Sequence, residues 1–101
     1  MKIENQGECL CISDIAELTA VNSAHFRDQI SAVLPTAPGV IEIDLSSTRF
    51  VDSSGLGALF ALYRATAQRS GVVLRLLNPR PEIRQLLELT QMQHLFEIVH
   101  R

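Results

Sequence analysis

Hydrophobic positions change their spacing at one stretch of the chain, and this change predicts a strand that runs into a helix. Residues 40–45 are mostly apolar and rich in β-branched side chains, which is typical of a buried strand. From Gly55 onward, apolar side chains recur at the spacing of one helix face, at Leu56, Leu59, Phe60 and Tyr63. Small polar residues lie between the two segments, so the pattern predicts a turn and the start of a helix there.

The remaining pattern predicts strands that alternate with helices. Further strands are expected over residues 1–5, 9–15, 72–77 and 95–99, the first two as a hairpin. One helix is expected to be capped by Thr19 or Asn22, the central one to end near Ser70–Gly71, and a third to begin near Pro81. Pro35–Gly39 is expected to be a loop. The alternation predicts a single α/β domain over residues 1–101, with a mixed, mostly parallel sheet of four to five strands covered by helices.

Composition and charge narrow the function classes. The chain has 101 residues, a length typical of one domain. Of these residues 47% are hydrophobic and 20% are charged, which is typical of a globular protein. Its net charge is −2 and its Arg residues are scattered, so we expect no nucleic-acid partner. No apolar run reaches the roughly 20 residues that span a bilayer, and the first residues lack the apolar core of a signal peptide. We therefore expect a cytoplasmic protein without direct membrane insertion.

Two cysteines and three aromatic residues are assigned to the interior. Cys9 and Cys11 are two residues apart in a predicted strand, so their side chains point to the same face, and both are expected in the core. A Cys-x-Cys pair without a second Cys or His pair is a weak metal signal, so we expect no metal and no cofactor. Phe50, Phe60 and Tyr63 are also expected in the core or at its edge.

The turn Asp52-Ser53-Ser54-Gly55 follows the central strand, at the sheet edge where function gathers in folds of this class. In the simplest interpretation, Ser53 or Ser54 caps the helix, because Ser is among the best N-cap residues. In another, Ser53 accepts a phosphate, whose charge the helix N-terminus tolerates and a docked partner does not. The turn would then act as a binary switch for protein binding.

Two further interpretations of the turn fit less well. A serine nucleophile on an elbow needs a Gly two positions before it, and Val51 or Asp52 stands there instead. None of the three histidines is marked as a general base. A receiver domain phosphorylated on Asp44 or Asp52 needs a Lys at the end of a later strand, and the only lysine is Lys2.

The sixteen residues from Asp44 to Leu59 strongly resemble a family signature. They are Asp-Leu-Ser-Ser-Thr-Arg-Phe-Val-Asp-Ser-Ser-Gly-Leu-Gly-Ala-Leu. This segment is similar, without a gap, to the signature of STAS domains and, among them, of bacterial anti-sigma factor antagonists. The similarity extends over most of the chain, to residues 9–12, 17–18, 78–79 and 86–90. The resemblance implies a STAS-type fold, which agrees with the order of elements predicted above.

The resemblance also implies a regulator that switches partners and is not itself an enzyme. In this family the unphosphorylated protein binds an anti-sigma factor or a related serine kinase and so releases a sigma factor. The kinase phosphorylates the first serine after the Asp, which here is Ser53, and a serine phosphatase reverses the step. The partner-binding surface implied around it consists of Thr19, Asp52, Ser54, Gly55, Leu56 and Gly57.

Three positions depart from the family pattern. Thr19 stands where the family has an Asp close to the phosphorylated serine, and it keeps an oxygen without the charge. Ala16 replaces a glycine in the same loop. Gln91 also replaces a glycine, and a left-handed backbone at this position would cost about 1 kcal/mol.

Leu56 is either an exposed anchor for a partner or a buried residue.

Two other functions stay open on the sequence. An accessory STAS subunit would dock on a transporter ATPase without being phosphorylated. A pocket for a small ligand or a nucleotide would occupy the same edge of the sheet. The residues make no prediction of the oligomeric state.

Overall fold

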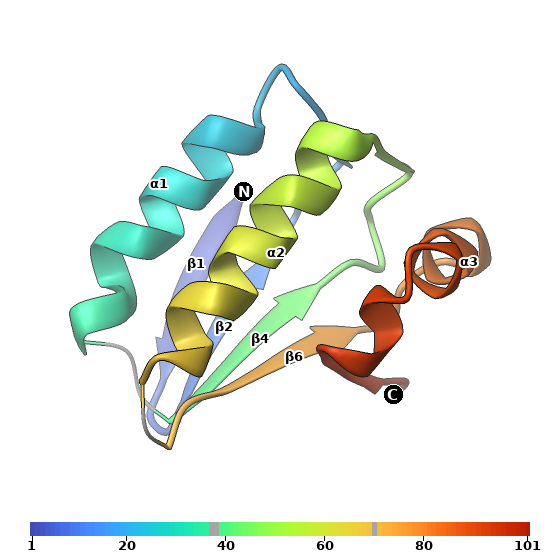
Figure 1. Ribbon diagram of the computed structural model, residues 1–101. Helices are drawn as coiled ribbons and strands as arrows, with labels where there is room; N and C mark the ends of the chain where they lie inside the picture. Colours follow the sequence, from blue (N-terminus) through green and yellow to red (C-terminus); the bar gives the residue numbers. More distant parts are fainter. Residues whose placement is uncertain (37–38, 70) are drawn as a thin grey trace.

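A five-stranded sheet forms the centre of the computed structural model, which describes residues 1–36, 39–69 and 71–101. β1 runs antiparallel to β2, and the other neighbouring strands are parallel (Figure 1). The mixed, mostly parallel sheet predicted from the sequence is therefore confirmed. Its strands, in spatial order, are β1 (Lys2–Gln6), β2 (Cys9–Ser13), β4 (Val40–Asp44), β6 (Val73–Leu77) and β7 (Glu97–Val99).

Three α-helices occur in the described residues, and two of them cover one face of the sheet. α1 (Ser23–Val33) and α2 (Ser53–Ala67) lie side by side across this face, whereas α3 (Pro81–Leu89) lies beyond β6 (Figure 1). One 3-10 turn follows α1 at Leu34–Thr36, and another follows α3 at Met92–His94. No helix of the described residues is long and apolar enough to cross a membrane.

Strand alternation puts the core between the sheet and these helices. Every second residue of the three central strands is buried against them: Leu10, Ile12, Ile41, Ile43, Leu74 and Leu76. The helices contribute Phe26 and Ile30 from α1 and Leu59 and Leu62 from α2. Burial of these side chains, at about 1.5–3 kcal/mol each, is the main stabilising term of the fold.

The opposite face of the sheet carries polar residues. Cys11, Glu42 and Arg75 lie beside one another on three neighbouring strands. Cys9 and Cys11 share this face and are half-buried. The prediction that the two cysteines belong to the core is wrong, because alternation along β2 turns Leu10 and Ile12 toward the helices instead.

A second, two-stranded sheet was not predicted. β3 (Glu17–Leu18) pairs in parallel with β5 (Phe50–Val51). This pairing holds the loop before α1 against the segment before α2. Strands of two residues are too short for an alternating pattern to be recognised in the sequence.

Several predicted boundaries move by a few residues. β2 ends at Ser13 rather than at residue 15, because Asp14 adopts φ +60° and leaves the strand. α2 ends at Ala67, before the predicted Ser70–Gly71; Ser70 lies outside the described residues, as do residues 37 and 38 of the predicted loop. Gly71 is left-handed at φ +80°. Gln91 is left-handed as well, at φ +62°, so the condition for the backbone cost considered at this position is met.

Candidate functional site

The segment 50–57 is held at the edge of the sheet by the small β3–β5 pair. Leu18 lies opposite Val51, and the carbonyl oxygen of Leu18 accepts a hydrogen bond from the N–H of Asp52 at 3.2 Å. The chain then enters α2, and Gly55 in its first turn packs directly on Leu18. A Cβ on Gly55 would stand 2.0 Å from the Leu18 carbonyl oxygen, so only glycine fits at this close approach.

Asp52, not Ser53 or Ser54, caps α2. Ser53 and Ser54 are already helical, so the extended residue before them occupies the cap position. The carboxylate of Asp52 accepts from the N–H of Gly55 through Oδ1 at 2.9 Å and from the N–H of Ala20 through Oδ2 at 3.0 Å. These two hydrogen bonds, the one from Gly55 first, hold the pKa of Asp52 below its usual value. One carboxylate thus fixes both the start of α2 and the loop before α1.

Ser53 and the six residues of the implied partner surface differ in exposure. The exposed ones are Ser53, Ser54 and Gly57. Two are half-buried, Asp52 and Leu56, and two are buried, Thr19 and Gly55. Ser53 lies exposed at the first position of α2. Leu56 packs partly against the core, so it is neither the free anchor nor the fully buried residue weighed above.

Thr19 shapes the loop beside Asp52 instead of presenting a surface. Its side chain is 7% exposed, and its hydroxyl oxygen accepts from the N–H of Val21 at 3.3 Å. Asn22 precedes α1 but does not cap it through its side chain. Instead, Asn22 Oδ1 accepts from the Thr19 N–H at 2.9 Å, and Nδ2 donates to the carbonyl oxygen of Glu17 at 2.7 Å. The loop is therefore closed by its own hydrogen bonds.

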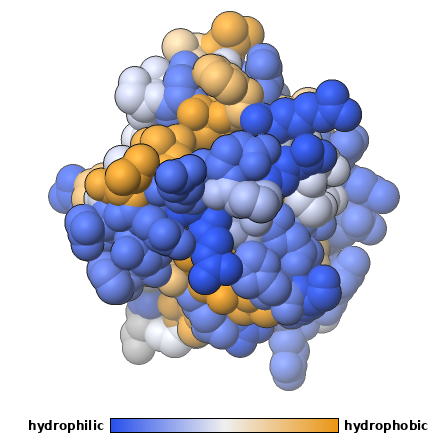
Figure 2. All heavy atoms as spheres, turned by 90° about the vertical axis from the view of Figure 1, so that its right-hand side faces the viewer, coloured by the Kyte–Doolittle hydropathy of each residue, from blue (hydrophilic) through white to orange (hydrophobic). Residues whose placement is uncertain are grey.

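Two exposed apolar side chains near Asp52 were missed by sequence reasoning. Val21 is 88% exposed and follows Ala20, whose N–H donates a hydrogen bond to Asp52. Phe50 is 60% exposed and lies two residues before Asp52. The assignment of Phe50 to the core or its edge is wrong, because its neighbour Val51 takes the inward position of β5. Phe60 is also 41% exposed. In Figure 2, hydrophobic side chains gather at the top of the molecule, which is the end at which α2 begins in Figure 1.

A hollow of about 240 Å³ lies next to this segment. Its lining includes Asp14, Glu17, His25 and Phe26, and no residue from Asp52 to Gly57. This volume is smaller than the roughly 300–1,000 Å³ of sites that enclose a drug-sized ligand. The described residues therefore give no support to a ligand pocket built from the turn itself.

Comparison with known proteins places the whole chain in one family. The profile of the STAS domain family matches residues 1–101. The chain belongs to the STAS domain family. A STAS-domain containing protein of Pseudomonas aeruginosa strain UCBPP-PA14, PA14_20770, is 36% identical to this STAS domain over 73 residues, which are 72% of this chain and 70% of that protein.

Solved structures share the fold of this STAS domain. TM1081 of Thermotoga maritima superposes with a TM-score of 0.89 at 20% identity, over 99% of this chain and 85% of that one. An anti-sigma factor antagonist from Mycobacterium paratuberculosis gives 0.85 at 25% identity, over 96% and 81%. The anti-sigma factor antagonist SpoIIAA of Bacillus, in its unphosphorylated form, gives 0.76 at 24% identity, over 97% and 86%. SpoIIAA has been solved in its phosphorylated form as well.

Proposed function

We propose that this STAS domain is a partner-switching regulator and not an enzyme. In its unphosphorylated form it binds an anti-sigma factor that is also a serine kinase, and a sigma factor is thereby released. The kinase phosphorylates Ser53 with its own ATP, the complex dissociates, and a serine phosphatase restores the binding form. The fold neighbours that are anti-sigma factor antagonists, one of them with a phosphorylated form, support this assignment.

The observation that carries the proposal is the environment of Ser53. This serine is exposed at the first position of α2, directly after a capping residue whose own side chain is tied down at two points. The position is therefore fixed by the fold, while the hydroxyl stays open to solvent. Exposed Val21 and Phe50 supply apolar area close to the same turn. A rigid acceptor beside apolar contact area is what a protein kinase and a docking partner both need.

Phosphorylation would change the surface without disturbing the fold. A phosphate adds about −1.5 to −2 charges, and the N-terminus of α2 offers it a favourable dipole. The same charge lies beside the carboxylate of Asp52, so any partner surface docked there meets two neighbouring negative groups. Docked apolar or acidic groups would lose their contacts or be repelled. The switch thus acts on the complex and leaves the stability of the free domain nearly unchanged.

The test is a pull-down from the native cell with wild-type, Ser53→Ala and Ser53→Asp baits, followed by intact-mass analysis of each bait. Ser46→Asp is the matched control, because it adds the same charge at an exposed serine of another loop. We expect an ATP-binding kinase with wild type, with Ser53→Ala and with the control, but not with Ser53→Asp. Wild type and the control alone should carry an added mass of about 80 Da at Ser53. If all four baits retain one transporter partner and no phosphate appears, the proposal is wrong.

The apolar flank of the turn gives an independent prediction. Exchanging Phe50 for Ser should weaken binding of the kinase partner by about 30-fold, or about 2 kcal/mol, the range of an interface anchor. Val21→Ser should act in the same direction. Leu89→Ser is the control, since Leu89 is 74% exposed on α3, away from the start of α2 (Figure 1). Calorimetric titration would measure all three; equal effects of Phe50→Ser and Leu89→Ser would remove Phe50 from the interface.

A further inference from the structure

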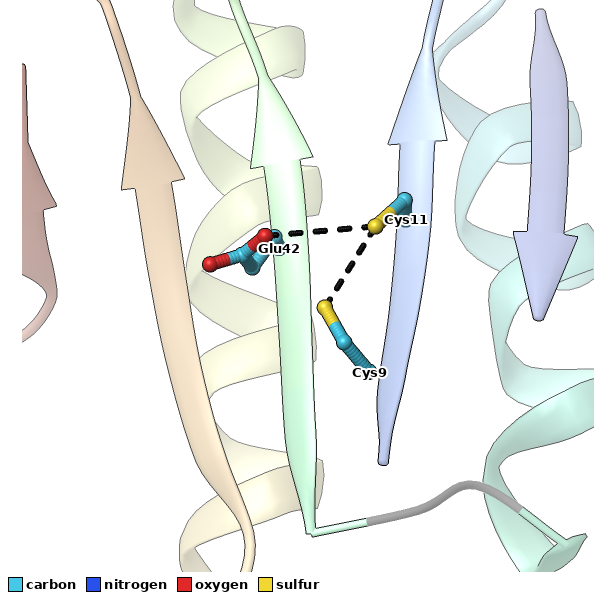
Figure 3. A group of neighbouring side chains, drawn as sticks. All are labelled: Cys9, Cys11 and Glu42. Atoms are coloured by element: carbon cyan, nitrogen blue, oxygen red, sulfur yellow. Dashed lines mark hydrogen bonds between the residues drawn. The ribbon is translucent and has the colours of Figure 1, made fainter. Parts of the chain in front are cut away.

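We infer that Cys9, Cys11 and Glu42 form a zinc-binding site on the sheet face opposite α1 and α2. Figure 3 shows the three side chains converging from β2 and β4 in front of the strands, with the helices behind. The Sγ atoms of Cys9 and Cys11 are 3.4 Å apart, and Cys11 Sγ is 3.9 Å from Glu42 Oε1. One donor atom of each residue lies within 4.8 Å of the others.

The distance between the two sulfurs and the distance from Cys11 Sγ to Glu42 Oε1 match tetrahedral zinc coordination to within a few tenths of an ångström. Zn–S bonds of about 2.3 Å and Zn–O bonds of about 2.1 Å put two sulfurs roughly 3.8 Å apart and sulfur and oxygen roughly 3.6 Å apart. Two thiols and one carboxylate are a donor set that suits Zn²⁺, with water at the fourth position. On binding, two S–H bonds are replaced by Zn–S bonds, and two protons pass to the solvent.

A disulfide is the competing fate of two neighbouring thiols, and strand geometry opposes it. Residues two apart on an extended strand have Cα atoms about 6.6 Å apart. This is close to the upper limit of about 6.8 Å for disulfides, so a bond within β2 would distort the ladder with β4. A bridging metal accepts the wider spacing, because it needs the sulfurs near one another but not bonded.

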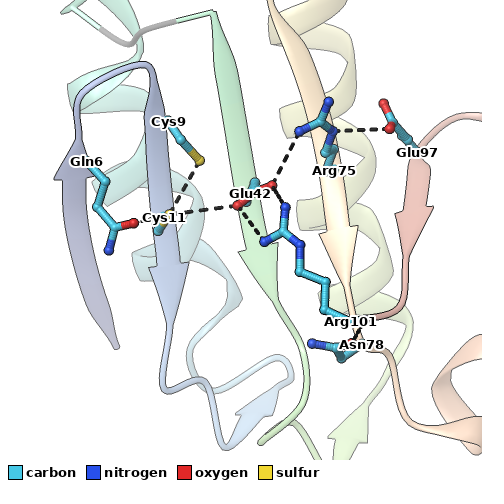
Figure 4. Close-up of polar contacts among 8 residues, drawn as sticks. All are labelled: Gln6, Cys9, Cys11, Glu42, Arg75, Asn78, Glu97 and Arg101. Atoms are coloured by element: carbon cyan, nitrogen blue, oxygen red, sulfur yellow. Dashed lines mark hydrogen bonds and ion pairs between the residues drawn. The ribbon is translucent and has the colours of Figure 1, made fainter.

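Two arginines donate hydrogen bonds to the carboxylate of Glu42. Carboxylates that bind metals are usually oriented by such hydrogen bonds. Arg101 binds both of its oxygens, at 3.2 Å to Oε1 and 2.6 Å to Oε2, and Arg75 approaches Oε2 at 3.4 Å (Figure 4). Oε1 keeps a lone pair toward the thiols, while the guanidinium groups fix its orientation. Glu42 is 5% exposed, so this orientation is buried and rigid. The positive charges also balance the negative charge that two thiolates and Glu42 leave around one Zn²⁺.

The thiols remain reachable, since both are half-buried on a face that α1 and α2 do not cover. Zinc bound there would tie β2 to β4 and stabilise the folded chain by mass action.

The test uses the full chain, kept reduced with a phosphine and titrated first with Co²⁺ as a spectroscopic probe, then with Zn²⁺ as competitor. We expect one Co²⁺ per chain, a thiolate-to-cobalt charge-transfer band, its loss on adding Zn²⁺, and a zinc-dependent rise in melting temperature. Cys9→Ser and Cys11→Ser should abolish the band. Glu42→Gln should weaken zinc binding by about 10–100-fold or more.

Glu4→Gln is the matched control for Glu42→Gln, because Glu4 lies opposite Cys11 on β1 and is paired with Lys2 instead. It should bind Co²⁺ and Zn²⁺ as wild type does. Absence of the charge-transfer band in the reduced wild-type chain, or its persistence in Cys9→Ser, overturns the site. Unchanged affinity in a folded Glu42→Gln overturns the three-ligand arrangement, and circular dichroism of each variant establishes that it is folded.

Discussion

Exchanging Gly55 for Ala should lower the free energy of unfolding by about 3 kcal/mol, near the upper end of the usual cost of overpacking. For a domain of this size, such a loss lowers the melting temperature by roughly 12–24 °C. The added Cβ would stand 2.0 Å from the backbone carbonyl oxygen of Leu18 and 2.8 Å from its carbonyl carbon. Neither is the end of a flexible side chain, so α2 must move away from β3 to make room.

Gly57 provides the matched control two residues further along α2. A Cβ at Gly57 meets no atom within 4 Å, and the residue is exposed. Gly57→Ala should therefore stabilise the domain by about 0.5–1 kcal/mol, since Ala loses less backbone entropy in a helix than Gly does. Thermal and urea unfolding measured on both variants would separate the two roles. Similar melting temperatures for Gly55→Ala and Gly57→Ala would show that α2 does not rest on Leu18.

The two glycines show what a sequence motif leaves open. Gly55 and Gly57 both belong to the signature that relates the chain to the STAS family, and in the sequence they look equivalent. Only the structure assigns a packing role to Gly55 and leaves Gly57 on the surface. If the partner-switching proposal holds, loss of partner binding in a stable Gly57→Ala variant would place Gly57 in the interface.

The larger features of the fold were predictable because they have long periodic signals. The β4–α2 unit combines an apolar run with a helical stripe, and both were located correctly to within a few residues. The β3–β5 pair was not predictable, since two residues carry no period. The cap was predicted at Ser53 or Ser54, one or two residues too late, because Asp and Ser are nearly equal as N-cap residues and composition alone does not choose between them.

The polar face of the sheet was missed although one residue marked it. Glu42 interrupts the apolar run of β4, and a glutamate flanked by Ile41 and Ile43 indicates a strand with one polar face. The strand was instead predicted to be buried, and the cysteines of β2 were assigned to the core with it. The partners of Glu42 come from residues 33 and 59 positions away, Arg75 and Arg101, and no local pattern connects them.

Replacing Asp52 should loosen two segments at once, and two variants separate them. Asp52→Ala removes both hydrogen bonds, so the first turn of α2 and the loop at Ala20 should both become mobile. Asp52→Asn keeps an oxygen for the N–H of Gly55 but turns an amide N–H₂ toward the N–H of Ala20, so that two donors face each other. In Asp52→Asn only the Ala20 loop should loosen. Amide hydrogen exchange would show protection lost at Ala20 and Gly55 in the Ala variant, but at Ala20 alone in the Asn variant.

The contribution of Asp52 to stability should also depend on pH. The N–H groups of Gly55 and Ala20 lower the pKa of Asp52 in the folded state relative to the unfolded state. The unfolded chain therefore binds a proton more readily, and the stabilisation is complete above the ordinary Asp pKa of about 3.9 and lost as the pH falls through the lower, folded value. Wild type should melt above Asp52→Asn at neutral pH, and the difference should narrow in acid. A difference that stays constant from pH 7 to the acid limit would show that the hydrogen bonds, and not the charge, hold the loop at the switch serine.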